Sequence, residues 1–326
     1  MKKISLFFLA ILFIASLCVG CAQNPADKQV LIYSSTEEYR NEYFLSRLKE
    51  QFPDYSITIE YMPSGNLAAK LVAEGVATQG DILLDIEYGY IDKLESVLAD
   101  LSAYDKSVFV EDLLYPTNKV FPMTRNGGCI AINPAILESK GLAVPQSYAD
   151  LLKPEYKGLI SMPNPKSSGT GYMFLKSLVN AWGEDAAFEY FDELSKNILQ
   201  FTSSGSGPVN ALVQGEAAIG LAMTAQSVTQ INEGVELEVL FFEEGSPYSL
   251  YGVGMVAGKE KSKAVKDVFE FFLSTLIAED KEKFFPEKVF KDLDFIIENY
   301  PSDIDYSDMS NNSNEEKERL LEKWNH

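Results

Sequence analysis

Small polar residues stand at the start of five segments whose patterns predict helices. The five stretches are SST (34–36), SGN (64–66), SSGTGY (167–172), SSGSG (203–207) and TAQS (224–227). Serine, threonine and glycine are common at helix N-termini, where free backbone N–H groups can bind an anion. Helix capping alone would explain any one stretch. Five of them, drawn from both halves of the chain, favour a shared site for an anionic group.

The loops and two nearby acids define a set of candidate ligand-binding residues. Hydroxyls and backbone N–H groups would hold the anionic end, while Asp85 or Glu87 would bind an amine or sugar hydroxyls at the opposite end. A solvated or capping acid is the alternative for both carboxylates. Arg125 and Lys166 are possible counter-charges, with surface or salt-bridge roles as the alternative. The predicted set is Ser34, Ser35, Thr36, Ser64, Gly65, Asp85, Glu87, Ser167, Ser168, Gly169, Thr170, Ser203, Ser204, Ser206, Thr224 and Gln226.

The composition argues against several other kinds of chemistry. The chain has one histidine, His326 at its last position, which disfavours histidine-based metal sites and Ser–His or Cys–His catalysis. The formal net charge of −20 argues against nucleic-acid binding, which requires a basic face. We therefore expect no cofactor, no metal site and no enzymatic activity.

The first residues have the pattern of an export signal. Two lysines precede an apolar run from Ile4 to Leu17, which is shorter than a transmembrane span of about 20 residues. Small residues then precede Cys21, as in the bacterial lipobox, where the cysteine carries lipid after cleavage. Cys18 stands where that pattern prefers leucine. We expect a signal and lipobox at 1–21, lipidation of Cys21, a tether at 22–29 and no internal disulfide, because only Cys129 remains.

The first third of the mature chain alternates between strand and helix patterns. Apolar runs at 30–35, 56–62 and 80–86 predict strands, and the segments 36–52 and 64–75 between them have helical spacing. Thr36 or Ser35 is the expected N-cap of the first helix. This alternation predicts a parallel sheet with right-handed crossovers. The carboxyl ends of such strands are where ligands usually bind.

The later segments predict a second α/β unit and a return to the first. Gly127–Gly128 is expected to form a bend between the units, and 252–258 is expected to return the chain to the first unit. A helix is expected from about Tyr172 to Trp182. The polar tail at 307–326 is expected to be a loosely held helix.

Together these segments resemble a substrate-binding protein of a bacterial ABC importer, in the group that includes ferric-iron, phosphonate and hexose-phosphate binders. The resemblance rests on VLIYSS (30–35), GNLAAKLVAEG with GDILLD (65–85), PEYKGLISMPNPKSSGTGY (154–172), GSGPVNALVQGEAAIGL (205–221) and EEGSPYSLYGVGMVAGKEKSKAVKDVFEFFL (243–273). It implies the two-lobed α/β fold of type II periplasmic binding proteins, with mixed, mostly parallel sheets flanked by helices and a ligand cleft between the lobes. The expected lobes are 30–124 with 250–280, and 125–249 with 281–326 including a C-terminal helical tail.

The resemblance implies a monomer, lipid-anchored outside the cytoplasm, that clamps a small anionic solute and delivers it to an ABC permease in the cytoplasmic membrane. A phosphorylated or phosphonate compound is the first interpretation, and ferric iron is the second. The iron-binding branch uses neighbouring tyrosines after the strand that corresponds to 217–223, where this chain has TAQSVTQI. Tyr88, Tyr90, Tyr248 and Tyr251 remain as possible iron ligands, or as packing residues.

Two other classes of function, an exported hydrolase and a surface adhesion protein, fit the sequence less well. An exported hydrolase would need a nucleophile and base, but SSGTGY is not the G-x-S-x-G elbow and no histidine is available for a triad. A surface adhesion protein would more often contain repeats or a low-complexity stalk, and the sequence has neither. A solute-binding protein fits the pattern better than either.

Overall fold

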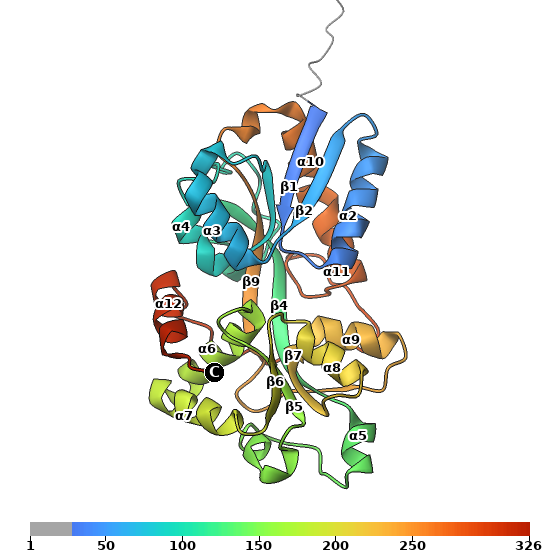
Figure 1. The fold of residues 1–326 in the computed structure, drawn as a ribbon. Coiled ribbons are helices and arrows are strands. Elements are labelled where there is room, and N and C mark those ends of the chain that lie inside the picture. Colours follow the sequence, from blue (N-terminus) through green and yellow to red (C-terminus); the bar gives the residue numbers. More distant parts are fainter. Residues whose placement is uncertain (1–27) are drawn as a thin grey trace, which may run out of the picture.

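The computed structural model describes residues 28–326 (Figure 1). The export signal, Cys18 and Cys21 therefore lie outside the described residues. The chain begins with strands β1 (Gln29–Ser34), β2 (Ser56–Tyr61) and β3 (Ile82–Glu87) and helices α2 (Glu38–Gln51), α3 (Ser64–Glu74) and α4 (Ile91–Leu94). β1 pairs in parallel with both β2 and β3, as the alternating pattern predicted.

Two long strands connect the upper and lower halves of the molecule (Figure 1). They are β4 (Val120–Ile132) and β9 (Tyr248–Met255), which pair antiparallel over the register from Val120↔Gly254 to Gly127↔Tyr248. β9 also pairs antiparallel with β3, so it completes the first sheet. The expected return of the chain is therefore confirmed.

The expected bend at Gly127–Gly128 is wrong, because both glycines lie inside the continuous strand β4. A Cβ atom at Gly128 would lie 2.8 Å from Met173 Cε and 2.9 Å from both Phe174 Cζ and Pro247 Cγ. The glycine therefore allows close packing of α6 (Gly169–Trp182) and the segment before β9 against the strand, rather than a turn.

The second half adds β5 (Ile160–Pro163), β6 (Ile198–Thr202), β7 (Ile219–Met223) and β8 (Glu238–Leu240). Its helices are α5 (Pro134–Ser139), α6 (Gly169–Trp182), α7 (Glu184–Leu194), α8 (Gly207–Val213) and α9 (Thr224–Asn232). The full sheet has the order β2-β1-β3-β9-β4-β7-β5-β6, with β8 paired to β4. β5 is parallel to β6 and β7, while β4 is antiparallel to β7, β8 and β9, so the sheet is mixed.

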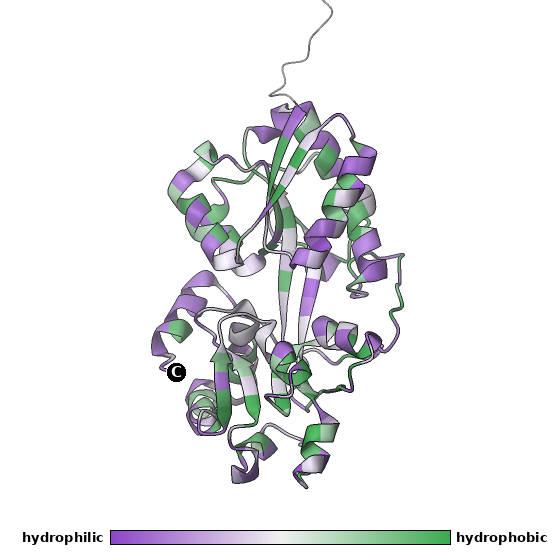
Figure 2. Cartoon of the chain, turned by 45° about the vertical axis from the view of Figure 1, so that its right-hand side comes forward, coloured by the Kyte–Doolittle hydropathy of each residue, from purple (hydrophilic) through white to green (hydrophobic). Residues whose placement is uncertain are grey.

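Separate apolar cores lie on either side of the connecting strands. In the first, Ile32, Phe44 and Phe269 are fully buried, and in the second, Ile219 and Phe174 are fully buried. We call these halves the first lobe and the second lobe. Apolar colours follow the strands and polar colours the outer helix faces (Figure 2), as expected for helices covering a buried sheet.

The segments that follow β9 contribute to both lobes. α10 (Lys263–Phe271) and α11 (Ile277–Lys283) pack on the first lobe, and Val289 and Phe290 also belong to its core. The first core therefore extends past the boundary expected at 280, as far as Phe290. The last helix, α12 (Asn314–Lys323), is not loosely held: Leu320 and Trp324 are fully buried in the second core. Among residues 28–326, no helix is both long enough and apolar enough to span a bilayer.

Candidate functional site

Three of the predicted polar loops come together in the second lobe. A Cβ at Gly205 would collide with Thr170 Oγ1 and would lie 3.5 Å from Met223 Sδ. The side chain of Gln226 donates weakly to Ser206 O at 3.4 Å. The start of α6, the 203–207 loop and the start of α9 therefore lie in contact, and the absence of a side chain at Gly205 makes the approach possible.

The helix α6 begins three residues earlier than expected. Ser168 is its N-cap, and its hydroxyl accepts a long hydrogen bond from Gly171 N at 3.5 Å. A Cβ at Gly171 would collide with Pro163 O, so this turn requires glycine. Gly169 and Thr170 thus form the first turn, where backbone N–H groups lack helical partners. The neighbouring Ser167 is exposed and donates to Asn164 O instead.

One face of the connecting strands carries polar side chains. Thr124 lies opposite Tyr251 and Asn126 opposite Ser249 in the β4–β9 register, so these four side chains share a face. The amide nitrogen of Asn126 lies 3.1 Å from Met223 Sδ, next to the second-lobe loops. This face therefore joins the second-lobe loops to the first lobe.

In the first lobe, SST (34–36) closes on itself. Ser34 is fully buried and donates to Asn41 Oδ1 at 2.7 Å, and its oxygen accepts from Thr36 N at 3.1 Å. Asn41 donates in turn to Thr36 O at 2.7 Å. The expected N-cap at Ser35 or Thr36 is wrong: Glu37 occupies the cap position of α2 without a side-chain bond. The Ser34 hydroxyl shapes the loop rather than capping the helix, and the Thr36 hydroxyl donates to Asp85 Oδ2 at 3.5 Å.

Arg40 is the centre of a buried cluster of ion pairs in the first lobe, next to this loop. Its guanidinium is 1% exposed and pairs with Asp85, Asp280 and Glu37 at 2.8–3.0 Å. It also donates to Thr124 Oγ1 at 3.0 Å, which ties the cluster to the connecting strands. Planar guanidinium groups suit such multidentate pairing.

Asp85 has an unusual backbone conformation for a residue in a strand. Its φ is +58°, a region that aspartate enters more easily than most residues, and the β3–β9 register shifts beside it. Burial raises the pKa of Asp85 despite the opposing effect of Arg40. One carboxylate oxygen pairs with Arg40, and the other, Oδ1, is buried without a hydrogen-bond partner among the described residues. Such outliers cluster at functional sites.

Glu87, at the end of β3, is the first-lobe residue nearest to α6. A Cβ at Gly169 would lie 3.2 Å from Glu87 Oε2 and 3.4 Å from the Tyr251 hydroxyl. The carboxylate binds the Lys317 ammonium of α12 at 2.8 and 2.9 Å, with both side chains at most 5% exposed. Burial opposes the charge on Lys317, but Glu87 outweighs it and raises the lysine pKa. Sequence reasoning missed Lys317, because nothing in the polar tail pattern indicates that it reaches the lobe junction.

Several buried polar atoms at this junction have no hydrogen-bond partner within residues 28–326. Leaving such groups unpaired normally costs stability, so each one indicates a place for a further polar partner. They come from the first lobe, the connecting strands and the second lobe: Ser35 Oγ, Asp85 Oδ1, Asn126 Oδ1, Ser249 Oγ, Thr224 Oγ1 and Gln226 Oε1. We call this set, with Thr170 and Glu87, the junction cluster.

The other predicted site residues lie at the margin of this cluster or outside it. Ser203 and Ser204 are exposed, with Ser204 bonded to Ser206 at 3.0 Å. Ser64 is half-buried, and the exposed Gly65 lies beside the Tyr90 hydroxyl. Lys166 is exposed. Arg125 lies on the opposite face of β4, where its guanidinium is 5.3 Å from the Tyr248 ring centroid and 4.6 Å from that of Tyr306.

The four candidate iron-binding tyrosines point to different surroundings. Tyr88 donates to Leu113 O at 2.8 Å, and Tyr248 lies on the Arg125 side of the connecting strands. Tyr90 packs against Lys317, and the Tyr251 hydroxyl lies beside Gly169 and Glu87. Burial raises the pKa of Tyr88, Tyr90 and Tyr251, which disfavours tyrosinate. Among residues 28–326, no group of three His, Cys, Asp or Glu residues is placed to hold a metal ion.

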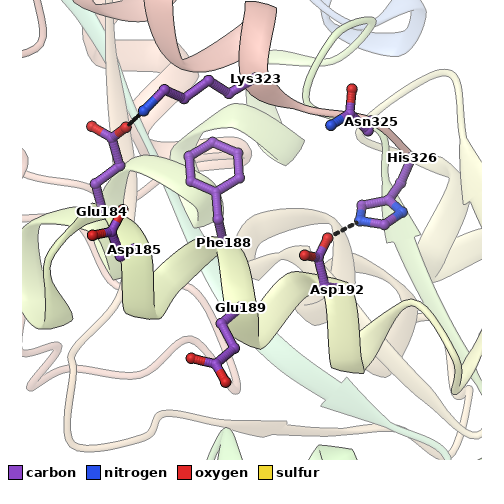
Figure 3. Close-up of a pocket in the computed structure, with 8 residues that line it drawn as sticks. All are labelled: Glu184, Asp185, Phe188, Glu189, Asp192, Lys323, Asn325 and His326. Carbon is purple, nitrogen blue, oxygen red and sulfur yellow. Dashed lines mark hydrogen bonds and ion pairs between the residues drawn. The ribbon is translucent and has the colours of Figure 1, made fainter.

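Two surface pockets lie away from the junction cluster, on the second lobe. One, of about 400 Å³, lies between α7 and the C-terminus; Lys323 pairs with Glu184 there and His326 with Asp192 (Figure 3). The other, of about 320 Å³, is lined by residues that include Trp182 and Tyr190. Neither contains a residue of the predicted set, so the junction cluster is the stronger candidate.

A family model described as bacterial extracellular solute-binding protein matches residues 67–312. The chain belongs to this family. The resemblance predicted from the sequence is therefore confirmed. The chain is an extracytoplasmic substrate-binding protein of an ABC importer. Its relatives are binding proteins rather than enzymes. The helix α12 lies beyond the matched residues.

Similar proteins of known structure have the same two-lobed fold. The periplasmic binding protein AfuA from Actinobacillus pleuropneumoniae, with fructose-6-phosphate bound, is 25% identical with a TM-score of 0.78, over 91% of this chain and 97% of that one. Iron-bound HitA from Pseudomonas aeruginosa is 16% identical with a TM-score of 0.77, over 90% and 98% of the two chains. The expected type II periplasmic-binding-protein fold is therefore confirmed.

Relatives in sequence also cover most of this binding protein. A Haemophilus influenzae protein of undescribed function is 27% identical over 286 residues, 84% of this chain and 80% of its own. The spermidine/putrescine-binding periplasmic protein of Salmonella typhimurium is 22% identical over 297 residues, 86% and 82% of the two chains. These names span different solutes, so the choice of solute depends on this chain's own residues.

Proposed function

We propose that this binding protein clamps a small organic solute carrying a phosphate or phosphonate group between its two lobes. The second lobe would hold the anionic group through Thr170, Thr224 and the backbone N–H groups that start α6 and α9. The first lobe would hold the other end, with Asp85 and Glu87 accepting from hydroxyl or amine groups. The observation that carries the proposal is the junction cluster, which includes buried polar atoms of both lobes and of the connecting strands that have no hydrogen-bond partner among residues 28–326.

Neutral donors suit this anionic group. The loops at 167–172, 203–207 and 224–227 contain no arginine or lysine, but they supply hydroxyls and two helix N-termini. Helix N-termini bind phosphate through free N–H groups and the aligned peptide dipoles. AfuA, at 25% identity, has fructose-6-phosphate bound, which supports a phosphorylated solute for this chain as well.

A thermal-shift titration of residues 28–326 tests the proposal. The compounds are fructose 6-phosphate, fructose, inorganic phosphate, 2-aminoethylphosphonate, spermidine and ferric citrate. A ligand that binds only the folded state raises the melting temperature progressively, because the stabilisation grows with the logarithm of its concentration above Kd. Concentration-dependent stabilisation by an organic phosphate or phosphonate, and not by fructose, is expected. Stabilisation by spermidine alone would contradict the proposal.

Ferric iron is the alternative solute, favoured by the iron-bound structure of HitA. It is the weaker proposal here because Tyr88 and Tyr248 are directed away from Tyr251. Iron held by tyrosinate would produce a visible absorption band on titration with ferric citrate. That band, lost in Tyr251→Phe and retained in Tyr88→Phe, would establish the alternative.

We further propose that Cys21 carries a lipid that anchors the monomer to the membrane beside its permease. Fractionation of cells that express the full chain would place the wild type in the membrane fraction. Cys21→Ser is expected to move the protein into the soluble extracytoplasmic fraction with its solute affinity unchanged. Equal membrane association of both forms would contradict lipidation at this residue.

A further inference from the structure

The helix α12 lies beside the junction of the lobes and contacts both (Figure 1). Its contacts with the second lobe are extensive. Leu320 and Trp324 are fully buried in the second core. At the C-terminal end of the helix, Lys323 pairs with Glu184 of α7 (Figure 3). Arg319 pairs with the same carboxylate. The helix is therefore firmly attached to the second lobe.

The segment that leads into α12 is attached to the same lobe. Asn180 of α6 donates to Asp308 O at 2.8 Å and to Ser310 O at 3.0 Å. Tyr172 donates to Asn312 Oδ1 at 2.8 Å. The approach to the helix is thus fixed along α6, and α12 would move with the second lobe.

Contacts of α12 with the first lobe are fewer and are charged. Lys317 binds both oxygens of Glu87, and its ammonium lies 4.4 Å from the Tyr90 ring centroid. On the other side, the same ammonium lies 4.8 Å from the Tyr172 ring of the second lobe. An exposed pair between Lys93 and Glu318 is the other ionic contact. The buried ammonium of Lys317 therefore lies between Glu87 and Tyr90 of the first lobe and Tyr172 of the second lobe.

We propose that α12 is a latch: fixed to the second lobe, it holds the first lobe through Lys317, and release of Glu87 allows the lobes to separate. The proposal rests on the proposed clamp, in which solute enters and leaves between the lobes. A buried pair of this kind is costly to break on one side only, because the remaining charge stays desolvated. A surface pair such as Lys93–Glu318 has little effect. The latch therefore depends on one residue of the helix.

The latch also explains why Glu87 is shared between two roles. The carboxylate that would accept from the solute is the one that binds Lys317. A bound solute that contacts both lobes would therefore add to the contacts that keep the lobes closed. Solute exchange and lobe separation are thus coupled through one carboxylate, a coupling typically worth about 5- to 150-fold in affinity.

Lys317→Met tests the latch, because methionine keeps an unbranched stem between the two rings but lacks the charge. Small-angle X-ray scattering of solute-free residues 28–326 should give a larger radius of gyration for the variant than for the wild type. Release of fructose 6-phosphate, followed by stopped-flow fluorescence, should be about tenfold faster or more. Tryptophan emission without solute should stay unchanged, since Trp182 and Trp324 both remain in the second lobe.

Glu318→Gln is the matched control, one residue along the same helix and also paired to the first lobe. Its scattering and release rate should equal those of the wild type. If Lys317→Met does not unfold cooperatively, Lys317→Gln replaces it, with a neutral donor at the same position. An unchanged radius of gyration in a folded Lys317 variant would overturn the latch. The scattering measurement does not require any solute to bind. If no phosphorylated compound stabilises the protein in the thermal-shift titration, the proposed solute class is overturned, but the scattering measurement still tests the latch.

Discussion

Arg40 and Asp280 form a bidentate ion pair in the interior of the first lobe. Arg40 Nε lies 2.8 Å from Asp280 Oδ1, and Nη2 lies 2.9 Å from Oδ2. Asp280 is fully buried, and the same guanidinium reaches Asp85 and Thr124. The Arg40 guanidinium therefore connects α2, α11, the end of β3 and the connecting strand β4, and it pairs with Asp85 of the junction cluster.

Arg40→Met is expected to destabilise the fold by about 3–5 kcal/mol, because Asp85 would stay buried without a cation and Asp280 would keep only Lys281, 2.9 Å away. Urea unfolding at pH 7, followed by circular dichroism, measures the change. Arg47→Met on the same helix is the control. Arg47 is 29% exposed and pairs with Glu279 and Glu50, so its loss should destabilise the fold far less than the loss of Arg40. Equal effects of the two substitutions would contradict the assigned importance of the buried pair.

The two buried aspartates are expected to affect stability at low pH in opposite directions. Burial alone would raise the pKa of Asp280, but Arg40 and Lys281 hold it below the ordinary value near 4. Its stabilising effect is present above that value and is lost as pH falls through the lower folded-state pKa. The stability advantage of the wild type over Asp280→Asn should therefore shrink below about pH 4.

For Asp85 the dependence of stability on pH is the opposite. Burial raises its pKa in the folded state, so the stability that the protonated side chain contributes is lost as pH rises through the folded-state pKa. The free energy of unfolding of the wild type relative to Asp85→Asn should accordingly increase as the pH is lowered toward 4. Urea unfolding of the three proteins between pH 7 and pH 3 measures both trends. Parallel pH profiles for the two variants would show that the ionisation states are assigned wrongly.

Thr170→Val is expected to weaken solute binding about 10- to 100-fold, because a hydrogen bond to a charged group contributes about 1.5–3 kcal/mol. Valine keeps the shape, so the melting temperature without solute should change little. Isothermal titration with the phosphorylated compound that gives the largest thermal shift provides the affinity. Ser167→Ala is the control from the same loop, since Ser167 is exposed and bonded to Asn164. Wild-type affinity in Thr170→Val would remove this hydroxyl from the site.

Cys129 is expected to resist alkylation in the native protein. Burial raises the pKa of its thiol to about 12, and the side chain lies inside β4 beside Ser227. The thiolate is the reactive form, so iodoacetamide at pH 8 should label residues 28–326 only after unfolding. Mass spectrometry with and without urea gives the labelled fraction. Rapid native labelling would show that the second core opens locally at this strand.

Much of the fold follows from patterns in the sequence. The alternation of apolar runs and helical spacing between residues 30 and 86 predicts β1, α2, β2, α3 and β3 in order, because periodicity of 2 or 3.6 reflects a buried face. The role of Gly128 was not predictable in this way. Its lack of a side chain accommodates Met173 and Phe174, which are distant in sequence, and a glycine pair alone resembles a turn.

The candidate site was predictable only where a short loop sequence is itself typical of a local structure, such as a capped helix N-terminus. The start of α6 is an example, since SSGTG specifies an N-cap and a tight first turn. Asn126 and Ser249 gave no local signal, because their proximity depends on the register of β4 and β9. Lys317 was missed for a related reason. The helix around it is mostly charged, and only the burial of Leu320 and Trp324 fixes its position.

The two connecting strands also impose an order on folding. β9 is the strand between β3 and β4 in the sheet, yet the entire second-lobe sheet lies between β4 and β9 along the chain. The first lobe therefore cannot complete its sheet until the chain beyond Met255 is available. Such non-local pairing makes folding slow and leaves the edge of β3 uncovered in the meantime. During export, the second-lobe strands β5 to β8 are available before β9 and can begin to form their sheet, whereas the second core is complete only when Leu320 and Trp324 have also crossed the membrane.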